Sequence, residues 1–426
     1  MALSGELARA YTEILKEELI PAMGCTEPIA IAYASSIISH ALCGNPTELR
    51  VGLSGNIIKN VKSVIVPMTG GMHGIDSAIC AGIISASPHK RLEVLGVLSE
   101  GDVEKIKEYK EKTPIEIYEL DTENAFEILI VGKKGGNTAT AKLCKRHTNV
   151  VFVTLNDFDV TEQYISAEDV VEKDSTDRSL LNVKDIVDFA ESVDLEELTP
   201  YLEKQISYNM AIAKEGIQGE WGASIGKTLL NTGNDWRVVA KAHAAGGSDA
   251  RMGGCELPVC IISGSGNQGI TASVPVIIYA EKIGADKESL LRALIASNLI
   301  TIHQKTGIGC LSAYCGAISA GCGCGCGIAF LDGGRYYEIA HTLVNAIAIL
   351  SGTICDGAKS SCAAKIAMAV EAGILGFEMM KSGHQFLGGD GIITKGVENT
   401  IKNVSRLAQI GMSETDREII KIMLGK

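Results

Sequence analysis

The chain reads HQKTGIGCLSAYCGAISAGCGCGCGIAFLDGG at residues 303–334 and, after a largely apolar run, SGTICDGAKSSCAAK at residues 351–365. These two segments hold seven of the 13 cysteines, and residues 306–331 carry no charged side chain. Glycine, alanine and serine let backbones approach closely, which suits packed helices around a buried cofactor held by thiolates. The alternative interpretation is that these cysteines are small hydrophobic residues of a core.

Cys355 and Cys362 stand apart from the other cysteines. They lie seven residues apart in CDGAKSSC, where Gly357 can bend the backbone and Lys359 can offset thiolate charge. The context therefore favours a ligand role for both of these thiols.

The run CGCGC at residues 322–326 predicts something different. Its cysteines alternate with glycine, so on a helix Cys322, Cys324 and Cys326 cannot all face one metal, and we expect them to be packing residues. The chain has no pair with the C-x₂-C spacing of zinc sites. A three-cysteine iron–sulfur site is therefore the better metal hypothesis.

Length and composition bound the class of protein. A chain of 426 residues predicts two or three domains. Its 46% hydrophobic and 21% charged residues are ordinary for a soluble globular protein. The net charge of −12, without a run of lysine and arginine, argues against a nucleic-acid partner, and no segment has the apolar length of a membrane span.

The first twenty residues predict a charged amphipathic helix and not a signal peptide. We therefore expect a cytoplasmic protein. In that compartment cysteines more often bind metals or take part in catalysis than form disulfides.

Hydrophobic periodicity predicts an α+β protein with a mixed α/β domain and a larger all-α domain that binds a cluster. Residues 62–68 and 90–98 are among the predicted strands, and the strands near 115–155 are expected to pair partly antiparallel. The expected organisation is: residues 1–45, helices that pack onto the helical domain; 46–165, the α/β domain; 166–200, a linker helix; 201–426, the all-α catalytic domain.

Two residues outside the cysteine-rich segments are candidate bases. Cys25 lies at or just before the start of a helix whose predicted N-cap is Thr26, where the macrodipole and free N–H groups lower a thiol pKa. His73 lies in a glycine-rich turn before another helix, and Asp76 could orient or charge its imidazole. An ordinary structural histidine is the alternative.

The segment GSGNQG at residues 264–269 matches the spacing of a dinucleotide-binding loop, but no βαβ unit surrounds it. We expect a loop before a helix whose N–H groups bind a small anion such as a carboxylate, or else a tight turn. Side chains that could add hydrogen bonds are Ser263, Ser265, Asn267 and Gln268. His147, in RHTNV at 146–150, is a further candidate or an ordinary polar start of a strand.

Several motifs together resemble the L-cysteine desulfidase family, which is related to the iron–sulfur L-serine dehydratases. They are GCTEP (24–28), TGGMHGID (69–76), SGSGNQG (263–269), LSAYCGAISAG (311–321) and GTICDGAKSSC (352–362). The resemblance spans nearly the whole chain. It implies a [4Fe–4S] cluster held by three cysteines with one iron open, and it identifies Cys25 with the proton acceptor of the family.

Carried onto this sequence, the resemblance implies the ligands Cys315, Cys355 and Cys362, with Cys310 as the alternative to Cys315. No cysteine follows Cys362, so the fourth, C-terminal cysteine ligand of some serine dehydratases is missing. The implied reaction is α,β-elimination from L-cysteine without pyridoxal phosphate, giving pyruvate, ammonia and sulfide. The open iron would act as a Lewis acid on the leaving group, and Cys25, or its rival His73, would remove the α-proton.

The loop 263–269, with groups such as Asn56 from the α/β domain, would hold the carboxylate and ammonium of the amino acid. L-serine dehydratase is the nearest alternative, and a non-catalytic iron–sulfur sensor is the alternative of another class. We expect a small amino acid substrate and a homo-oligomer, with no nucleic-acid or membrane partner.

Overall fold

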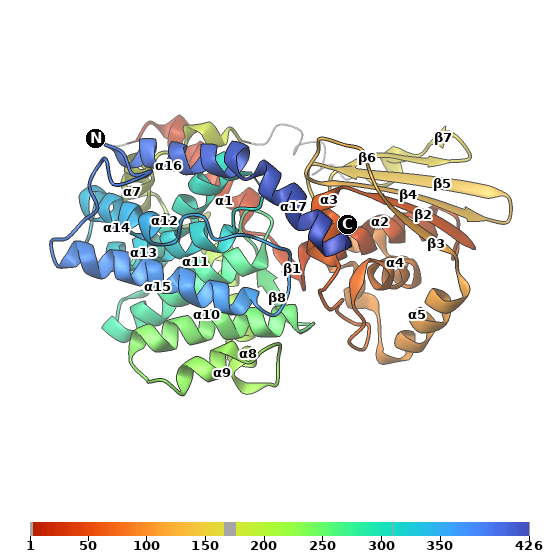
Figure 1. Cartoon of the computed structure of the whole chain (residues 1–426), viewed down its shortest axis with the longest axis horizontal. Helices are drawn as coiled ribbons and strands as arrows, with labels where there is room; N and C mark the ends of the chain where they lie inside the picture. The colour runs from red at the N-terminus through yellow and green to blue at the C-terminus, as the bar shows by residue number, and fades with distance from the viewer. Residues whose placement is uncertain (1–2, 166–175, 310, 426) are drawn as a thin grey trace.

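The molecule has two parts of unequal size. The computed structural model describes residues 3–165, 176–309 and 311–425. Figure 1 shows a large stack of helices beside a smaller part in which helices lie against a sheet. The predicted α+β fold with a large helical domain is confirmed.

Helix α13 (Gly316–Leu331) runs through the centre of the larger part. The helices packed around it are α11 (Gly266–Ile283), α12 (Lys287–Ile308), α14 (Tyr336–Leu350) and α15 (Cys362–Lys381). Its glycines make this possible, because a Cβ at Gly321 would collide with the carbonyl oxygen of Ala369 on α15. Each helical glycine costs about 1 kcal/mol relative to alanine, and the close helix contact offsets that cost.

The three alternating cysteines of α13 are core residues, as predicted. Cys324 and Cys326 have no exposed surface and Cys322 has 1%. The thiol of Cys324 donates to the Gly321 carbonyl oxygen at 3.1 Å, so its hydrogen is satisfied within the helix.

Further helices complete the larger part: α1 (Gly5–Glu18), α7 (Val183–Ser192), α8 (Thr199–Gln218), α9 (Ile225–Leu230), α10 (Trp236–Met252), α16 (Val397–Arg406) and α17 (Ser413–Leu424), with a π-helical turn at Leu407–Gly411. The predicted linker at 166–200 includes residues 166–175, which lie outside the described residues. Its helix α7 packs against α12 and thus belongs to the helical part.

The smaller part contains a six-stranded sheet in the order β3-β2-β4-β5-β6-β7. Strand β2 pairs parallel with β3, and the remaining neighbours are antiparallel, which confirms the antiparallel pairing expected near 115–155. The strands are β2 (Glu48–Leu53), β3 (Ile115–Glu119), β4 (Glu127–Lys134), β5 (Asn137–Cys144), β6 (Val150–Leu155) and β7 (Phe158–Asp159).

Two segments predicted as strands are not strands. Residues 62–68 contribute only an isolated bridge between Ile65 and His73. Residues 90–98 fall largely in the 3₁₀ segment η1 (Pro88–Val97), which packs its buried leucines and valine against helix α2. A proline at the start of η1 and a kink inside it suit a turn-rich segment better than a sheet ladder.

Helix α2 (Thr26–Ala41) corrects the expectation that residues 1–45 pack onto the helical domain. Helix α1 does lie against α7 and α12, but α2 packs against α4 (Gly74–Ser85), η1 and strands β4 and β5. Its side chains are buried on every face from Thr26 to Ser39, so it needs cover on all sides. The sheet on one side and α4 on the other supply that cover.

Two connections join the parts. Strand β1 (Pro21–Met23) pairs antiparallel with β8 (Pro258–Cys260), a short strand within the region predicted as all-α. Helix α17 leaves the helical part and reaches α3 (Gly55–Val61), as Figure 1 shows. There Asp416 accepts from Lys59 at 2.5 Å, and the Lys59 side chain is only 1% exposed.

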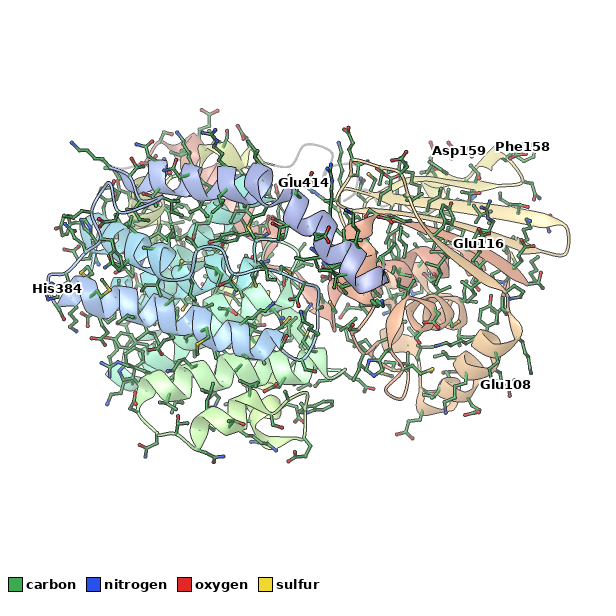
Figure 2. The ribbon with its side chains drawn as sticks, viewed as in Figure 1. Glu108, Glu116, Phe158, Asp159, His384 and Glu414 are labelled. Carbon is green, nitrogen blue, oxygen red and sulfur yellow. The ribbon has the colours of Figure 1, made fainter. Side chains whose placement is uncertain are left out.

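Several glutamates lie on the surface of the two parts. Figure 2 shows Glu108, on α5 (Glu100–Lys112), and Glu116 at the outer side of the smaller part, and Glu414 where α17 starts. Among the described residues, no helix has the length and apolarity that crossing a membrane requires.

Candidate active site

A cavity of about 100 Å³ lies where the two parts meet. The smaller part and its N-terminal connection contribute Cys25, Glu27 and Asn60 to its lining. The helical part contributes side chains of three kinds, which are thiols, cations and amides: Cys315, Cys355, Cys362, Arg251, Lys305, Lys365, Asn267 and Gln268. The three cysteines proposed as ligands thus reach one cavity.

A backbone bridge places Cys315 next to Cys355. Tyr314 and Ile354 form an antiparallel bridge, the N–H of Cys315 donates to Thr353 at 3.0 Å, and the N–H of Cys355 donates to Ala313 at 2.6 Å. Cys315 is also the N-cap residue of α13. Two cysteines that are far apart in sequence are therefore held side by side by main-chain hydrogen bonds, which do not depend on their thiols.

Cys362 is the first residue of α15 and completes the set. The loop before it turns at Gly357, whose φ of +90° favours glycine and whose missing Cβ makes room for the carbonyl oxygen of Lys59. In the same loop the Asp356 carboxylate accepts from Lys359 and from Lys365, each at 2.5 Å. The predicted roles of Gly357 in bending the chain and of Lys359 as a nearby cation have a structural basis.

The thiols of this set differ in charge. The hydrogen bond donated by Cys315, with Lys59 and the N–H of Gly357, outweighs burial and lowers the pKa of Cys355 to about 5. The same hydrogen bond, together with burial, raises the pKa of Cys315 well above its usual value, and burial raises that of Cys362. Cys355 is thus a thiolate near neutral pH, which is the form that binds iron.

Cysteines at a cavity can hold either a single metal ion or an iron–sulfur cluster. Within the described ranges, no three histidine, cysteine, aspartate or glutamate side chains stand close enough to hold a single ion. Cluster ligands stand farther apart, because each thiolate binds a different iron of the core. Three cysteines around one cavity, with a thiolate among them and Lys305 and Lys365 nearby, fit an anionic iron–sulfur cluster.

Cys25 lines the cavity from the N-cap of α2, one residue before the predicted N-cap Thr26, and is 2% exposed. Its thiol donates to Oε2 of Glu27 at 3.2 Å. Burial and the Glu27 charge raise the Cys25 pKa well above its usual value, although the sequence suggested a lowered one. The helix N-terminus is outweighed mainly by burial, and then by the neighbouring carboxylate.

Glu27 is a buried carboxylate that the sequence analysis missed. Burial alone would raise its pKa, but His147, the hydrogen bond from Cys25 and the charge of Arg251 outweigh burial and lower it. Arg251 is 2% exposed and donates through Nε to the Gly24 carbonyl oxygen at 2.9 Å. The cavity therefore pairs a protonated thiol with an ionised carboxylate.

The glycine-rich loop opens helix α11, as predicted, and Ser265 is the N-cap residue of that helix. Ser265, Asn267 and Gln268 line the cavity. The side-chain oxygens of Asn267 and Gln268 are buried without a hydrogen-bond partner. A buried amide oxygen without a partner is costly, so these two atoms point to a bound group that donates hydrogens.

Ser263 and His147 line a second cavity of about 320 Å³, which shares Lys305 and Leu311 with the first. The N–H of Ser263 donates to Glu18 at 2.7 Å. The His147 ring lies 3.0 Å from where a Cβ on Gly264 would be, and its Nε2 is buried without a partner. Burial lowers the pKa of His147, against the pull of Glu27.

Two predicted residues line neither of these two cavities. His73 is the exposed N-cap residue of α4 and lines none of the cavities described here, and Asp76 pairs with Lys110 at 2.7 Å instead of orienting it. Asn56 lines a third cavity. Asn60, about one helical turn further along the same face of α3, is the asparagine that lines the candidate site.

Asn60, Arg251 and Lys305 were missed along with Glu27. Glu27 stands within GCTEP, so the motif itself carried the signal. Arg251 and Lys305 are buried charges on α10 and α12, and a buried charge is a functional or paired residue as a rule. Cys310 lies outside the described residues, so the choice of Cys315 over it remains a prediction.

The chain is similar to several UPF0597 proteins over nearly its whole length. The UPF0597 protein of Desulfitobacterium hafniense is 52% identical over 421 residues, which is 98% of this chain and 97% of that protein. The UPF0597 protein of Treponema denticola is 44% identical over 430 residues, 100% of both. That of Lachnoclostridium phytofermentans is 49% identical over 414 residues, 97% of this chain and 98% of that protein.

A family model described as serine dehydratase alpha chain matches residues 89–421, which include the three candidate ligand cysteines and the glycine-rich loop. That match covers most of the chain. The chain therefore belongs to the serine dehydratase alpha chain family and is a relative of the iron–sulfur serine dehydratases.

Proposed function

We propose that this protein is a [4Fe–4S]-dependent L-cysteine desulfidase, which converts L-cysteine and water into pyruvate, ammonia and sulfide without pyridoxal phosphate. The observation that carries the proposal is the convergence of three kinds of group on one cavity. These are three cysteines, a thiol hydrogen-bonded to a buried carboxylate, and two buried amides without partners.

Cys315, Cys355 and Cys362 would hold the cluster. When bound, it would supply an iron that no cysteine of the protein occupies, and this iron would act as a Lewis acid on the leaving group at the β-carbon. The backbone bridge between Tyr314 and Ile354 would fix the spacing of two of these ligands before the cluster binds. The remaining steps fall to the side chains of the chain itself.

The amino acid would be held by its charged ends. Arg251 is a buried cation that lines the cavity and would attract the α-carboxylate, as would the N–H groups at the start of α11. The unpartnered oxygens of Asn267 and Gln268 would accept hydrogens from the α-ammonium group. Both ends would be fixed on the helical part, near the cysteines.

Cys25 would take up the α-proton. It stands at the N-cap of α2, whereas the cluster ligands come from the helical part, and all four cysteines line the same cavity. Removal of the α-proton and departure of the β-substituent give aminoacrylate, which becomes an imine and then hydrolyses to pyruvate and ammonia. His73 is not proposed as the base because it is exposed outside the cavity.

The test is an assay of protein reconstituted with iron and sulfide without air. We expect visible thiolate-to-iron absorbance, and sulfide and pyruvate in equal amounts from L-cysteine. Gln268→Leu, which removes one unpartnered oxygen, should raise KM by about tenfold, since each such hydrogen bond contributes about 1.5 kcal/mol. A protein with a full cluster that releases no sulfide from L-cysteine would overturn the proposal.

L-serine dehydratase is the second candidate, because the matching family model carries that description. The site is the same, and only the leaving group at the β-carbon differs. Pyruvate formation from L-serine with a kcat/KM above that from L-cysteine would favour it.

A non-catalytic iron–sulfur sensor is the remaining alternative. The unpartnered amides favour a bound amino acid instead, and that predicts a spectral change at the cluster on addition of L-cysteine or L-serine. An unchanged cluster spectrum with both amino acids, and no pyruvate, would favour the sensor.

A further inference from the structure

The surroundings of Glu27 raise a question about proton transfer. Glu27 is only 8% exposed, and three polar groups surround its carboxylate. Cys25 donates to Oε2 at 3.2 Å, Asn60 Nδ2 donates to Oε1 at 2.9 Å, and Thr26 Oγ1 lies 3.0 Å from Oε2. Such a carboxylate could simply tie α2 to α3, which is the structural alternative.

The hydrogen bond from Cys25 indicates that Glu27 does more than link α2 to α3. A thiol that donates a hydrogen is protonated, and a protonated sulfur cannot keep a second hydrogen. Cys25 can therefore accept the α-proton only if its own hydrogen leaves at the same time. Glu27 Oε2 is the acceptor that the thiol already contacts.

The Thr26 hydroxyl can hydrogen-bond to Glu27 in either protonation state of the carboxyl group. Its hydroxyl has one hydrogen and two oxygen neighbours, the Gly264 carbonyl at 2.8 Å and Glu27 Oε2 at 3.0 Å. A carbonyl can only accept, so the hydroxyl hydrogen points to Gly264 when Glu27 is protonated. The lone pair of Thr26 Oγ1 then accepts the new hydrogen on Oε2, and no buried polar atom loses its partner.

We propose that Glu27 is the proton-accepting partner of Cys25: as the thiol sulfur takes the α-proton, its own hydrogen passes to Glu27 Oε2. This proposal rests on the proposed function. The α C–H bond breaks, its electron pair forms the C=C bond, and the β-substituent leaves with the electron pair of its own bond. One proton is gained by the Cys25–Glu27 pair, and it returns to solvent or product before the next turnover.

Glu27 acts through Cys25 and is thus a positioning residue, not one that touches substrate. Other groups that face it are His147, Arg251 and Asn60, whereas the hydrogen bond of the Cys25 sulfur goes to Glu27 itself. Arg251 keeps its charge throughout and donates to Gly24. Glu27 is therefore the group through which a substitution should change the thiol directly.

The first test is spectroscopic and uses the protein before any cluster is loaded. The infrared S–H stretching band of Cys25 is identified as the band that Cys25→Ala removes. We expect Glu27→Gln to move this band to higher frequency, because a neutral amide is a weaker acceptor than a carboxylate. Cys80→Ala, a buried cysteine of α4, is the matched control and should remove a different band that Glu27→Gln leaves in place.

The second test uses the reconstituted protein. Glu27→Gln should lower kcat about 10²-fold or more at full cluster content, and should increase the kinetic isotope effect with α-deuterated substrate. Glu27→Asp, which keeps the carboxylate, should recover part of kcat. An S–H band that does not move, or a Glu27→Gln kcat within about threefold of the unsubstituted protein, would overturn the proposal.

The two proposals fail in different ways. If the unsubstituted protein carries a cluster but makes no product from either amino acid, the proposed function is wrong. The S–H band, which needs no turnover, then decides by itself whether the Cys25 hydrogen is held by Glu27.

Discussion

Helix α13 carries cysteines in two opposite settings. Cys315 stands at its N-cap, beside Cys355 and facing a cavity, whereas Cys322, Cys324 and Cys326 lie inside the helix and face other helices. Burial does not separate the two sets, since Cys315 is only 8% exposed. The groups around the sulfurs do.

Inside the helix, the backbone N–H groups are used by the helix itself. Burial there raises the pKa of Cys322 to about 12, and the thiol of Cys324 donates its hydrogen to the Gly321 carbonyl oxygen. In the loop before α15, the hydrogen bond from the neighbouring Cys315 thiol, with Lys59 and the N–H of Gly357, lowers the pKa of Cys355 to about 5. The comparison shows that the groups around a sulfur, and not its burial, decide whether it is a thiolate that can serve as a ligand.

The largest expected effect separates the two sets directly. Cys355→Ala should abolish cluster binding and turnover together, because it removes the thiolate of the set. Iron, acid-labile sulfide and pyruvate formation measure this. Cys324→Ala is the matched control and should bind a full cluster. A full cluster in Cys355→Ala would break the comparison.

The next effect concerns the cysteine at the N-cap of α2. Cys25→Ala should keep the cluster and lower kcat about 10³-fold, because it removes the group that takes up the α-proton. Visible absorbance at matched protein concentration provides the control for cluster content. Normal turnover would show that another group is the base.

A smaller effect follows from the thiol pKa values. Since the pKa of Cys355 is lowered to about 5, its thiolate is present above about pH 5 and is lost as the pH falls through that value. In protein without iron, iodoacetamide should modify Cys355 about tenfold faster at about pH 7 than at about pH 4, as measured by peptide mass spectrometry. Cys322 should stay unmodified throughout, and equal rates for both would contradict the comparison.

The smallest effect concerns stability. Cys322→Ala should lower the free energy of unfolding by about 1 kcal/mol, since it removes one packed sulfur atom and leaves cluster binding unchanged. Denaturant unfolding of the protein before cluster loading measures this. A loss of cluster in Cys322→Ala would show that the packing set also serves the site.

Prediction from the sequence succeeded where the signal is local. The helix that follows His73, the antiparallel strands near 115–155 and the packing role of Cys322 follow from periodicity over a few residues. It failed for residues 90–98, whose alternating apolar pattern predicted a strand. They lie largely in a 3₁₀ segment packed on α2. It also failed for α2, whose partner on the other side cannot be read from its own residues.

The candidate site shows the same division. The motifs around Cys25, Cys355 and Gln268 led to side chains that line one cavity, because thiols, glycines and amides in those patterns have few other uses. His73 and Asn56 carry equally suitable groups but point elsewhere. Asn56 and Asn60 share one face of α3, so which of them lines the site depends on where along the helix the helical part meets it, and packing sets that position.

By itself, the sequence determined the two-part α+β architecture and the cysteine-rich helical part, which follow from local backbone chemistry and hydrophobic periodicity. The candidate ligand set came from the resemblance that its motifs carry. Only the tertiary structure decided that Glu27, Asn60 and Arg251 complete the site, and that Cys25 is a protonated thiol instead of a thiolate. The reason is physical: the charge of a buried group depends on neighbours brought from distant segments, and their approach is set by how the two parts pack.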